Sequence, residues 1–202
     1  VSLNPSPNVS LLDISAGLGG AARALNEMFG VYVTGLEAHP ELARIGAEMS
    51  KRKGMTKVAS VEHYDPMQLA PTRLYNGVLA REGLFHQPHL GEVFARAVKA
   101  LKPGGTLVLL DYVRVPSENP NSRYLAWMDS ERQMVHPWTS KQYGDACKEL
   151  NLEVHALEDM TDSYRKTVLH GWATMLADLH VADLGEGEAT ALVEEAEMWM
   201  HR

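Results

Sequence analysis

Hydrophobic and polar positions follow two different rhythms over the first 115 residues. Short apolar runs rich in β-branched residues predict strands over Val9–Ile14, Val31–Glu37, Lys57–Glu62, Leu74–Ala80 and Thr106–Val115. Between them, longer segments with apolar residues on one face predict helices over Gly20–Phe29, Pro40–Lys53 and Pro88–Leu101. This alternation predicts an α/β fold: a doubly wound, mostly parallel sheet with helices on both faces.

The pattern changes after Val115. Residues 116–139 are polar, aromatic and interrupted by prolines, which predicts a lid insertion after the fifth strand. Beyond it we expect a helix over Ser140–Leu150, a strand over Leu152–Leu157, and helices over Ser163–Leu179 and Glu186–Trp199. Residues 1–202 are expected to form a single domain. The first predicted strand begins within ten residues of the N-terminus, and no strand is predicted after the last helix. Both features fit either a complete protein or a fragment that lacks N-terminal cap helices and the last strand.

Composition and charge narrow the class of protein. Hydrophobic residues make up 45% and charged residues 22%, as in ordinary globular proteins, and no apolar run reaches the ~20 residues that a membrane helix needs. The net charge of −7, with no basic cluster longer than Lys51–Lys53, argues against a nucleic-acid partner. The single cysteine, Cys147, fits a reducing compartment, so we expect a cytoplasmic protein. The oligomeric state stays open.

The nine histidines raise the question of a metal site. They are scattered along the chain, and neither an H-x-x-x-H pattern nor a Cys/His cluster is present. The sequence therefore predicts no metal.

A cluster of small residues follows the first predicted strand. In "LLDISAGLGG", Gly17, Gly19 and Gly20 stand between a strand and a helix, where glycine lets a ligand approach the backbone and the helix N-terminus favours an anionic group. Glu37 ends the second predicted strand, at the place where an acid binds the two hydroxyls of a ribose. The alternative is a tight turn that only packs helix on strand. The spacing does not match G-x-G-x-x-G, and no G-K-[ST] is present.

The opening stretch resembles the first motif of the class I S-adenosylmethionine-dependent methyltransferases, D-x-G-x-G-x-G. Asp13 matches the acid, Gly17 and Gly19 match the second and third glycines, and Ser15 replaces the first. Glu37 matches the ribose acid of the same family, and "HYDPMQL" resembles its third motif, which places Asp65 at the adenine amino group. The segment "FARAVKALKPGGTLVLLDYV" is the closest match, and "TSKQYGDACKELNLEV" resembles the small-molecule and lipid-headgroup branch.

The fourth-strand region, "LYNGVLAREGLFHQP", is also similar to small-molecule members of this family. Leu84 and His86 fit the pattern, whereas Asn76 stands where aspartate is usual. The resemblance implies S-adenosylmethionine as cofactor and S-adenosylhomocysteine as product. It assigns these residues to the cofactor site: Asp13, Ser15, Ala16, Gly17, Gly19, Glu37, Ala38, Asp65, Pro66, Met67, Ala80 and Arg81.

Methyl transfer from a sulfonium is an in-line displacement, so the protein mainly aligns an unprotonated amine or oxygen nucleophile and excludes water. Candidate bases are His86, His136 and Tyr112, with Tyr124 and Tyr143 as further choices. For His86 we favour a structural role, in which it anchors the loop after the fourth strand. For His136, in the expected lid, contact with substrate and simple packing are both open.

Three functions compete on this sequence. The first is a methyltransferase that acts on a small-molecule nucleophile. The second is a catalytically inactive binding or regulatory protein with the same fold, motivated by Ser15, Asn76 and Ala80. The third, a dinucleotide-dependent oxidoreductase, is disfavoured by the glycine spacing. The surviving glycine turn and the acids Glu37 and Asp65 favour the first.

Overall fold

The structure, a computed structural model, describes residues 4–116, 121–131, 133–178 and 184–201. The chain divides into two compact units, one formed by Val1–Pro116 and Val135–Val154 and the other by Ser117–Met134 and His155–Arg202. Residues 117–120 and 132 of the expected insertion, and Leu179 at the end of an expected helix, lie outside the described residues.

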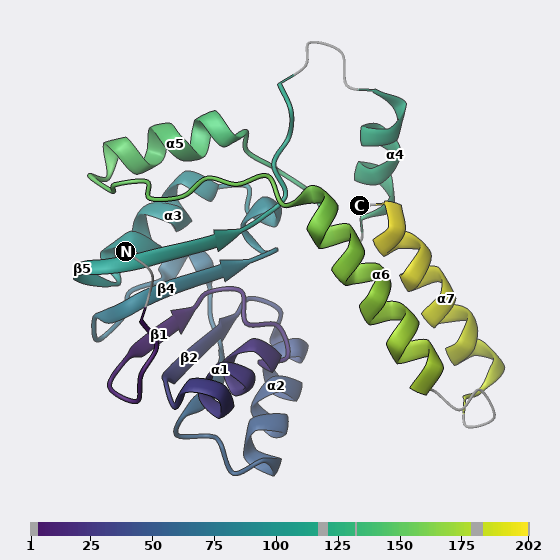
Figure 1. The fold of residues 1–202 in the computed structure, drawn as a ribbon, viewed down its shortest axis with the longest axis horizontal. Coiled ribbons are helices and arrows are strands. Elements are labelled where there is room, and N and C mark those ends of the chain that lie inside the picture. Colours follow the sequence, from purple (N-terminus) through teal and green to yellow (C-terminus); the bar gives the residue numbers. More distant parts are fainter. Residues whose placement is uncertain (1–3, 117–120, 132, 179–183, 202) are drawn as a thin grey trace. The chain divides into compact units, whose positions relative to one another are not determined.

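The first unit is built on a five-stranded parallel sheet with the order β3-β2-β1-β4-β5 (Figure 1). Its strands are β1 (Ser10–Asp13), β2 (Tyr32–Glu37), β3 (Ala59–His63), β4 (Tyr75–Arg81) and β5 (Leu101–Leu110). Parallel strands need a crossover between them, and helices supply it here. The predicted doubly wound α/β fold is therefore confirmed.

The helices of this unit start and stop at residues suited to those positions. They are α1 (Gly20–Phe29), α2 (Pro40–Arg52), α3 (Leu90–Lys99) and α5 (Ser140–Glu149), with short 3-10 turns η1 (Pro66–Gln68) and η2 (Leu84–His86). α1 ends at Gly30, whose φ of 70° is left-handed, and α2 has Pro40 in its first turn. α5 opens with a capping box between Thr139 and Gln142.

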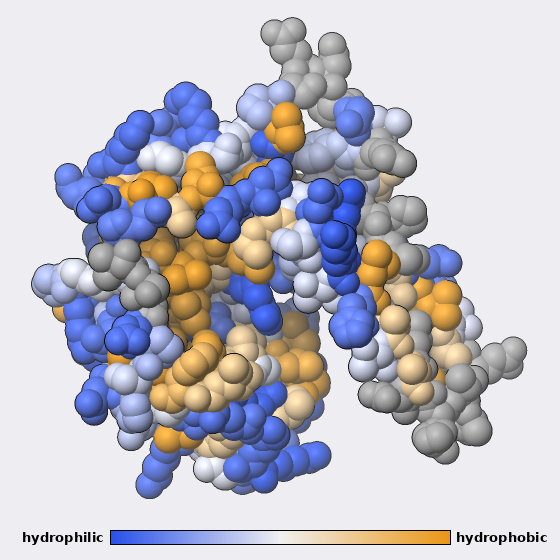
Figure 2. All heavy atoms as spheres, in the orientation of Figure 1, coloured by the Kyte–Doolittle hydropathy of each residue, from blue (hydrophilic) through white to orange (hydrophobic). Residues whose placement is uncertain are grey.

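Both faces of the sheet are packed. Leu12 of β1 belongs to a core cluster with Val78 and Phe94, on the side of α3 and α5. The neighbouring Leu11 points the other way and joins a cluster with Ala22 of α1. Figure 2 shows apolar side chains also gathered on the surface over β4 and β5, where Val108 is 45% exposed.

Two strand predictions need correction. The predicted strand over Leu152–Leu157 is wrong: residues 152–160 form no strand, and the Leu152 amide donates back to the Cys147 carbonyl of α5. Residues 153–160 are exposed and pair with no strand of the sheet, and the Met160 carbonyl accepts from the Tyr164 amide of α6 instead. β5 begins at Leu101 rather than Thr106, because the chain re-pairs with β4 through a register shift that includes Gly104, with φ 74°.

The second unit is helical and consists of α4 (Ser122–Ser130), α6 (Thr161–Asp178) and α7 (Glu186–His201), of which α6 and α7 are neighbours (Figure 1). Among its described residues none is buried. Residues 135–139, which end the expected lid insertion, are part of the first unit, and Val135 and Thr139 are buried there. Within the described part of the chain, no helix is long and apolar enough to span a membrane.

Candidate functional site

The candidate site lies at the carboxyl ends of β1 and β4, where the strand order of the sheet reverses. β1 pairs with β2 on one side and with β4 on the other, so the connections leaving β1 and β4 run to opposite sides. Open α/β sheets bind ligands at the carboxyl ends of the strands at such a point. The turn after β1 is held there from both sides, because the Ile14 amide donates to Leu79 O at 2.9 Å and the Ala16 amide to Leu36 O at 3.1 Å.

The glycines of this turn have backbone reasons to be glycine. Gly17 and Gly19 have φ values of 53° and 73°, which side-chain-bearing residues rarely adopt. A Cβ at Gly19 would lie 2.4 Å from the Val61 methyl Cγ2, whereas none of the described atoms lies within 4 Å of a Cβ at Gly17. The turn thus packs against β3 at Gly19 and is open at Gly17, just before the N-terminus of α1.

Ser15 replaces a glycine of the family motif and has a definite partner. Its Oγ accepts a hydrogen bond from the Arg81 amide at 2.6 Å, which ties the turn after β1 to the end of β4. The preceding Asp13 is 4% exposed and accepts from the Ser15 amide at 3.1 Å. Burial raises the pKa of Asp13 to about 6, against the opposing effects of the Ser15 amide and Arg81. Ala80, the neighbour of Arg81, is buried in the core.

Glu37 is clamped at the end of β2. Oε2 accepts from the Gly17 amide at 2.7 Å and Oε1 from the His39 amide at 2.8 Å. An ionised carboxylate has about four acceptor positions, so each oxygen can take a further donor. The geometry therefore fits two ligand hydroxyls beside the glycine turn, with the exposed Ala38 next in the chain.

Asp65 lies at the end of β3 and caps η1. It accepts from the Met67 amide and from Gln68 Nε2, both at 2.9 Å, while Pro66 and Met67 are half-buried. An exposed carboxylate beside two apolar side chains can serve an amino group on a flat ring. Sequence reasoning missed the adjacent Tyr64, whose hydroxyl donates to the Ile14 carbonyl at 2.7 Å and joins β3 to the turn after β1. Burial raises the Tyr64 pKa and keeps it protonated.

The three candidate bases come together around Phe85 of η2. The rings of Phe85 and His86 have centroids 3.9 Å apart, and the Tyr112 ring meets Phe85 edge-on at 5.0 Å. The His136 amide donates to the Phe85 carbonyl. His86, Tyr112 and His136, which are far apart in the sequence, thus all contact Phe85 beyond the ends of β4 and β5.

Asp111 is a candidate that sequence reasoning missed. It directly follows β5, and its Oδ2 accepts from the Tyr143 hydroxyl at 2.7 Å. Burial raises the pKa of Asp111 to about 6. The nearby amides of Tyr112 and Phe85 lower it, although Oδ1 is buried without a hydrogen-bond partner of proper geometry in the described part of the chain. The signal was available, because "LVLLD" ends an apolar strand in an acid as "LLD" does at Asp13.

We also searched the described residues for groups of side chains that could bind a metal ion. Among the residues that the structure describes, no three His, Cys, Asp or Glu side chains are grouped so as to hold a metal ion.

Comparison with known proteins agrees with this geometry. Residues 2–157 match the family described as "Methyltransferase domain". The phosphoethanolamine N-methyltransferase of Plasmodium falciparum (isolate 3D7) is 22% identical over 161 residues, covering 79% of this chain and 59% of that protein. The chain thus spans about three fifths of the length of this curated relative.

Two solved structures show how widely the fold is shared. Phosphoethanolamine N-methyltransferase 2 of Haemonchus contortus, in complex with phosphomonomethylethanolamine and S-adenosylhomocysteine, has a TM-score of 0.80 at 18% identity, covering 98% of this chain and 46% of that one. The [4+2]-cyclase SpnF has a TM-score of 0.71 at 19% identity, covering 98% and 70%.

The family match covers the glycine turn, Glu37 and Asp65, and it continues through the strands that position them. By that match, and by the parallel sheet that holds these groups at its carboxyl edge, the chain belongs to the class I S-adenosylmethionine-dependent methyltransferase family.

Proposed function

We propose that this chain transfers a methyl group from S-adenosylmethionine to a small-molecule nucleophile, an amine or an oxygen. The observation that carries the proposal is the Glu37 carboxylate, held by the amides of Gly17 and His39 with acceptor positions to spare. The relative from Plasmodium falciparum is named for N-methylation of phosphoethanolamine, which supports a small acceptor.

In this proposal the cofactor binds across the carboxyl ends of β1, β2 and β3. The turn Asp13–Gly19 lies under the methionine part, Glu37 accepts the ribose hydroxyls, and Asp65 accepts the adenine amino group. Ala38, Pro66 and Met67 cover the ring, and Ala80 and Arg81 close the far side of the turn through Ser15. The bound cofactor supplies a methyl group already activated by the sulfonium charge.

The acceptor side is proposed at the Phe85 cluster, formed by Phe85, His86, Tyr112 and His136, with Asp111 beside it. Ionised Asp111 can hold a cationic amine, and His86 or His136 can take its proton before transfer. For His86 the loop-anchoring role is the alternative, which its ring contact with Phe85 also supports.

The test is calorimetric titration with S-adenosylhomocysteine, with NAD as a ligand control. Glu37→Ala should weaken binding by about 1–3 kcal/mol, roughly 5- to 150-fold, because a ligand hydroxyl loses a charged acceptor. Glu41→Gln is the matched control, since Glu41 is exposed and forms its ion pair with Arg44, one turn away on α2. If Glu37→Ala binds S-adenosylhomocysteine with an unchanged dissociation constant, the assignment of Glu37 to the cofactor site is wrong.

A second candidate is a protein that keeps the fold without methyl transfer, and the likeness to a [4+2]-cyclase favours considering it. Two departures from the family pattern no longer support it. Ser15 bonds the Arg81 amide, and Asn76 lies at the opposite, amino end of β4, where it accepts from Ser10 and Lys102. Transfer of labelled methyl to an amine and phenol panel, with cofactor binding intact, separates the two.

A further inference from the structure

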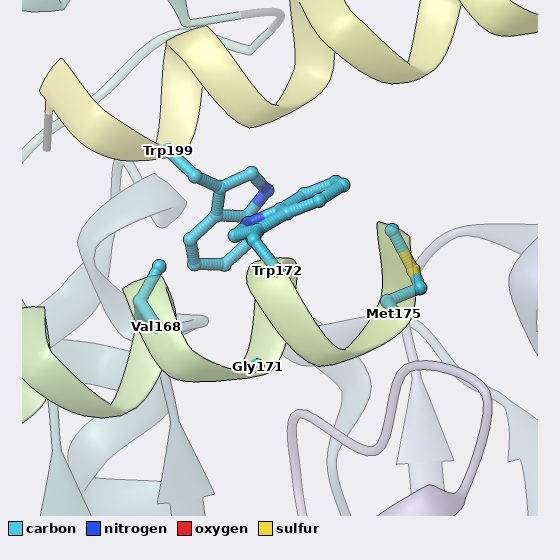
Figure 3. Close-up of a pocket in the computed structure, with 5 residues that line it drawn as sticks. All are labelled: Val168, Gly171, Trp172, Met175 and Trp199. Atoms are coloured by element: carbon cyan, nitrogen blue, oxygen red, sulfur yellow. The ribbon is translucent and has the colours of Figure 1, made fainter. Parts of the chain in front are cut away.

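Two features of the chain play no part in the methyl-transfer proposal. The first is a hollow between α6 and α7 of the second unit, where the indole rings of Trp172 and Trp199 lie close to each other (Figure 3). None of the residues that line it carries a charge, so nothing in the hollow selects a ligand. The second is a buried charge in the first unit, on Arg23 of α1, and it bears on the cofactor turn.

Arg23 is buried, and its guanidinium hydrogen-bonds neutral groups. Only 5% of the residue is exposed. One terminal nitrogen donates to the Leu18 carbonyl at 2.8 Å and to the Ser50 hydroxyl at 3.2 Å, and the other lies 3.9 Å from the Met49 sulfur. Among the residues that the structure describes, no carboxylate forms an ion pair with it. Because an arginine side chain stays protonated in proteins, a positive charge is buried here among neutral partners.

The guanidinium lies against the backbone of the glycine turn. A Cβ added at Gly19 would lie 3.0 Å from Arg23 Nη1, and the Leu18 carbonyl that Arg23 holds belongs to the same turn. At Gly17, two residues earlier, none of the described atoms lies within 4 Å of an added Cβ. The buried charge therefore supports the packed part of the turn and lies next to its open part.

The N-terminus of α1 adds to this positive charge. Gly19 is its N-cap and offers no side-chain acceptor, and the first turn of α1 contains no acidic residue. The two carboxylates at the turn have other donors, since Asp13 accepts from the Ser15 amide and Glu37 from the Gly17 amide. The helix dipole and the guanidinium thus act together. Because burying a charge without a counter-charge is costly, an anionic group of a ligand is favoured at this place.

We propose that Arg23 sets the affinity of the turn for the carboxylate in the methionine part of the cofactor. The inference rests on the proposed function, which places that part of the cofactor at the turn. The ligand carboxylate at the N-terminus of α1 supplies the counter-charge that the described chain does not give Arg23. Little water screens a charge that is buried, so the attraction acts through the backbone of the turn. Arg23 is thereby a specificity-determining residue for donors that carry a carboxylate.

The test measures the coupling between Arg23 and the ligand carboxylate by calorimetric titration of the full chain. S-adenosylhomocysteine is compared with S-adenosyl-3-thiopropylamine, which keeps the adenosine, the thioether and the amine and lacks only the carboxylate. Arg23→Met, neutral and of similar length, should weaken S-adenosylhomocysteine binding about 5- to 20-fold and binding of the analogue less than about twofold. Arg52→Met, at an exposed arginine of α2 that pairs with Glu48, is the matched control and should change neither.

Two further variants separate charge from shape, and they decide the matter if Arg23→Met fails to fold. Arg23→Gln keeps an N–H donor without the charge and should repeat the selective loss, whereas Arg23→Lys keeps the charge and should retain binding within about threefold. Equal weakening of both ligands, no weakening of either, or the same loss in the Gln and Lys variants would show that Arg23 only supports the turn, and would overturn this inference alone. A wild-type chain that binds neither ligand would overturn the cofactor assignment together with it.

Discussion

Ser15 and Gly83 show how one unusual residue constrains another far along the chain. Ser15 bonds the Arg81 amide, and a Cβ added at Gly83 would lie 2.5 Å from the Ser15 Cβ. The φ of Gly83 is −133°, so an alanine there meets a steric limit and no backbone strain. The serine in the motif and the glycine after β4 are therefore a matched pair.

Gly83→Ala should lower the free energy of unfolding by about 1–3 kcal/mol, because the new methyl overpacks against Ser15. In a Ser15→Gly background the same change should cost much less, since the clashing Cβ is gone. Urea unfolding of the wild type, both single variants and the double variant measures this coupling. Simple additivity of the two changes would contradict the proposed contact.

At the scale of elements, the helices of the first unit are specified by their ends. α5 is the clearest case: Thr139 accepts from the Gln142 amide at 3.2 Å, and the Gln142 side chain accepts from the Thr139 amide at 2.9 Å. The capping box satisfies backbone amides that the first helical turn leaves without partners. α5 in turn carries Tyr143, which bonds Asp111 at the candidate site.

Thr139→Ala should therefore cost about 0.5–2 kcal/mol of stability, and more if its buried position leaves a gap. Ser140→Ala is the control, since Ser140 is exposed and lies one residue inside the helix. Thermal unfolding of both variants checks the prediction. A Thr139→Ala protein as stable as the control would show that the capping box contributes nothing.

The failed strand over Leu152–Leu157 belongs to the same scale. Its alternating leucine and valine suit a strand, but a strand exists only when another offers it a hydrogen-bonding edge. The chain turns back onto α5 at Leu152 and leaves the first unit at Val154. Local pattern alone does not supply the missing partner.

At the scale of the whole molecule, the buried carboxyl of Asp13 and the half-buried carboxyl of Asp111 make stability depend on pH. Asp13 and Asp111 have pKa values raised by burial to about 6, above the ordinary 3.8. As pH rises, the unfolded chain loses these protons first, so stability falls between about pH 4 and pH 6 and the loss is complete above that range. The loss in the free energy of unfolding from each of the two groups is about 3 kcal/mol at most.

Asp13→Asn keeps the acceptor for the Ser15 amide and removes the charge. Its stability relative to the wild type should therefore rise by up to about 3 kcal/mol from pH 4 to pH 7, and Asp111→Asn should behave alike. Glu62→Gln, at an exposed position in β3, serves as the control and should show no such trend. Denaturant unfolding across this pH range measures the differences, and a flat profile in both variants would refute the assignment.

The alternation of strands and helices, the glycine turn, Glu37 at the end of β2 and Asp65 just after β3 could all be read from the sequence. These follow from short-range rules: apolar periodicity, helix ends, and the need for glycine where φ is positive. The family could also be predicted from the sequence, because its motifs occur in a fixed order along the chain, each at the end of a predicted strand.

Which distant residues meet became clear from the folded chain alone. It joined Ser15 to Arg81 and Glu37 to Gly17, and it hydrogen-bonded Asp111 to Tyr143. It also brought His86, Tyr112 and His136 to Phe85. In the folded chain, residues 152–157 also have no neighbouring strand to pair with, and residues 135–139 are part of the first unit. The physical reason is common to all of these: hydrogen-bond partners, burial and strand edges are supplied by other parts of the chain, and no local pattern encodes them.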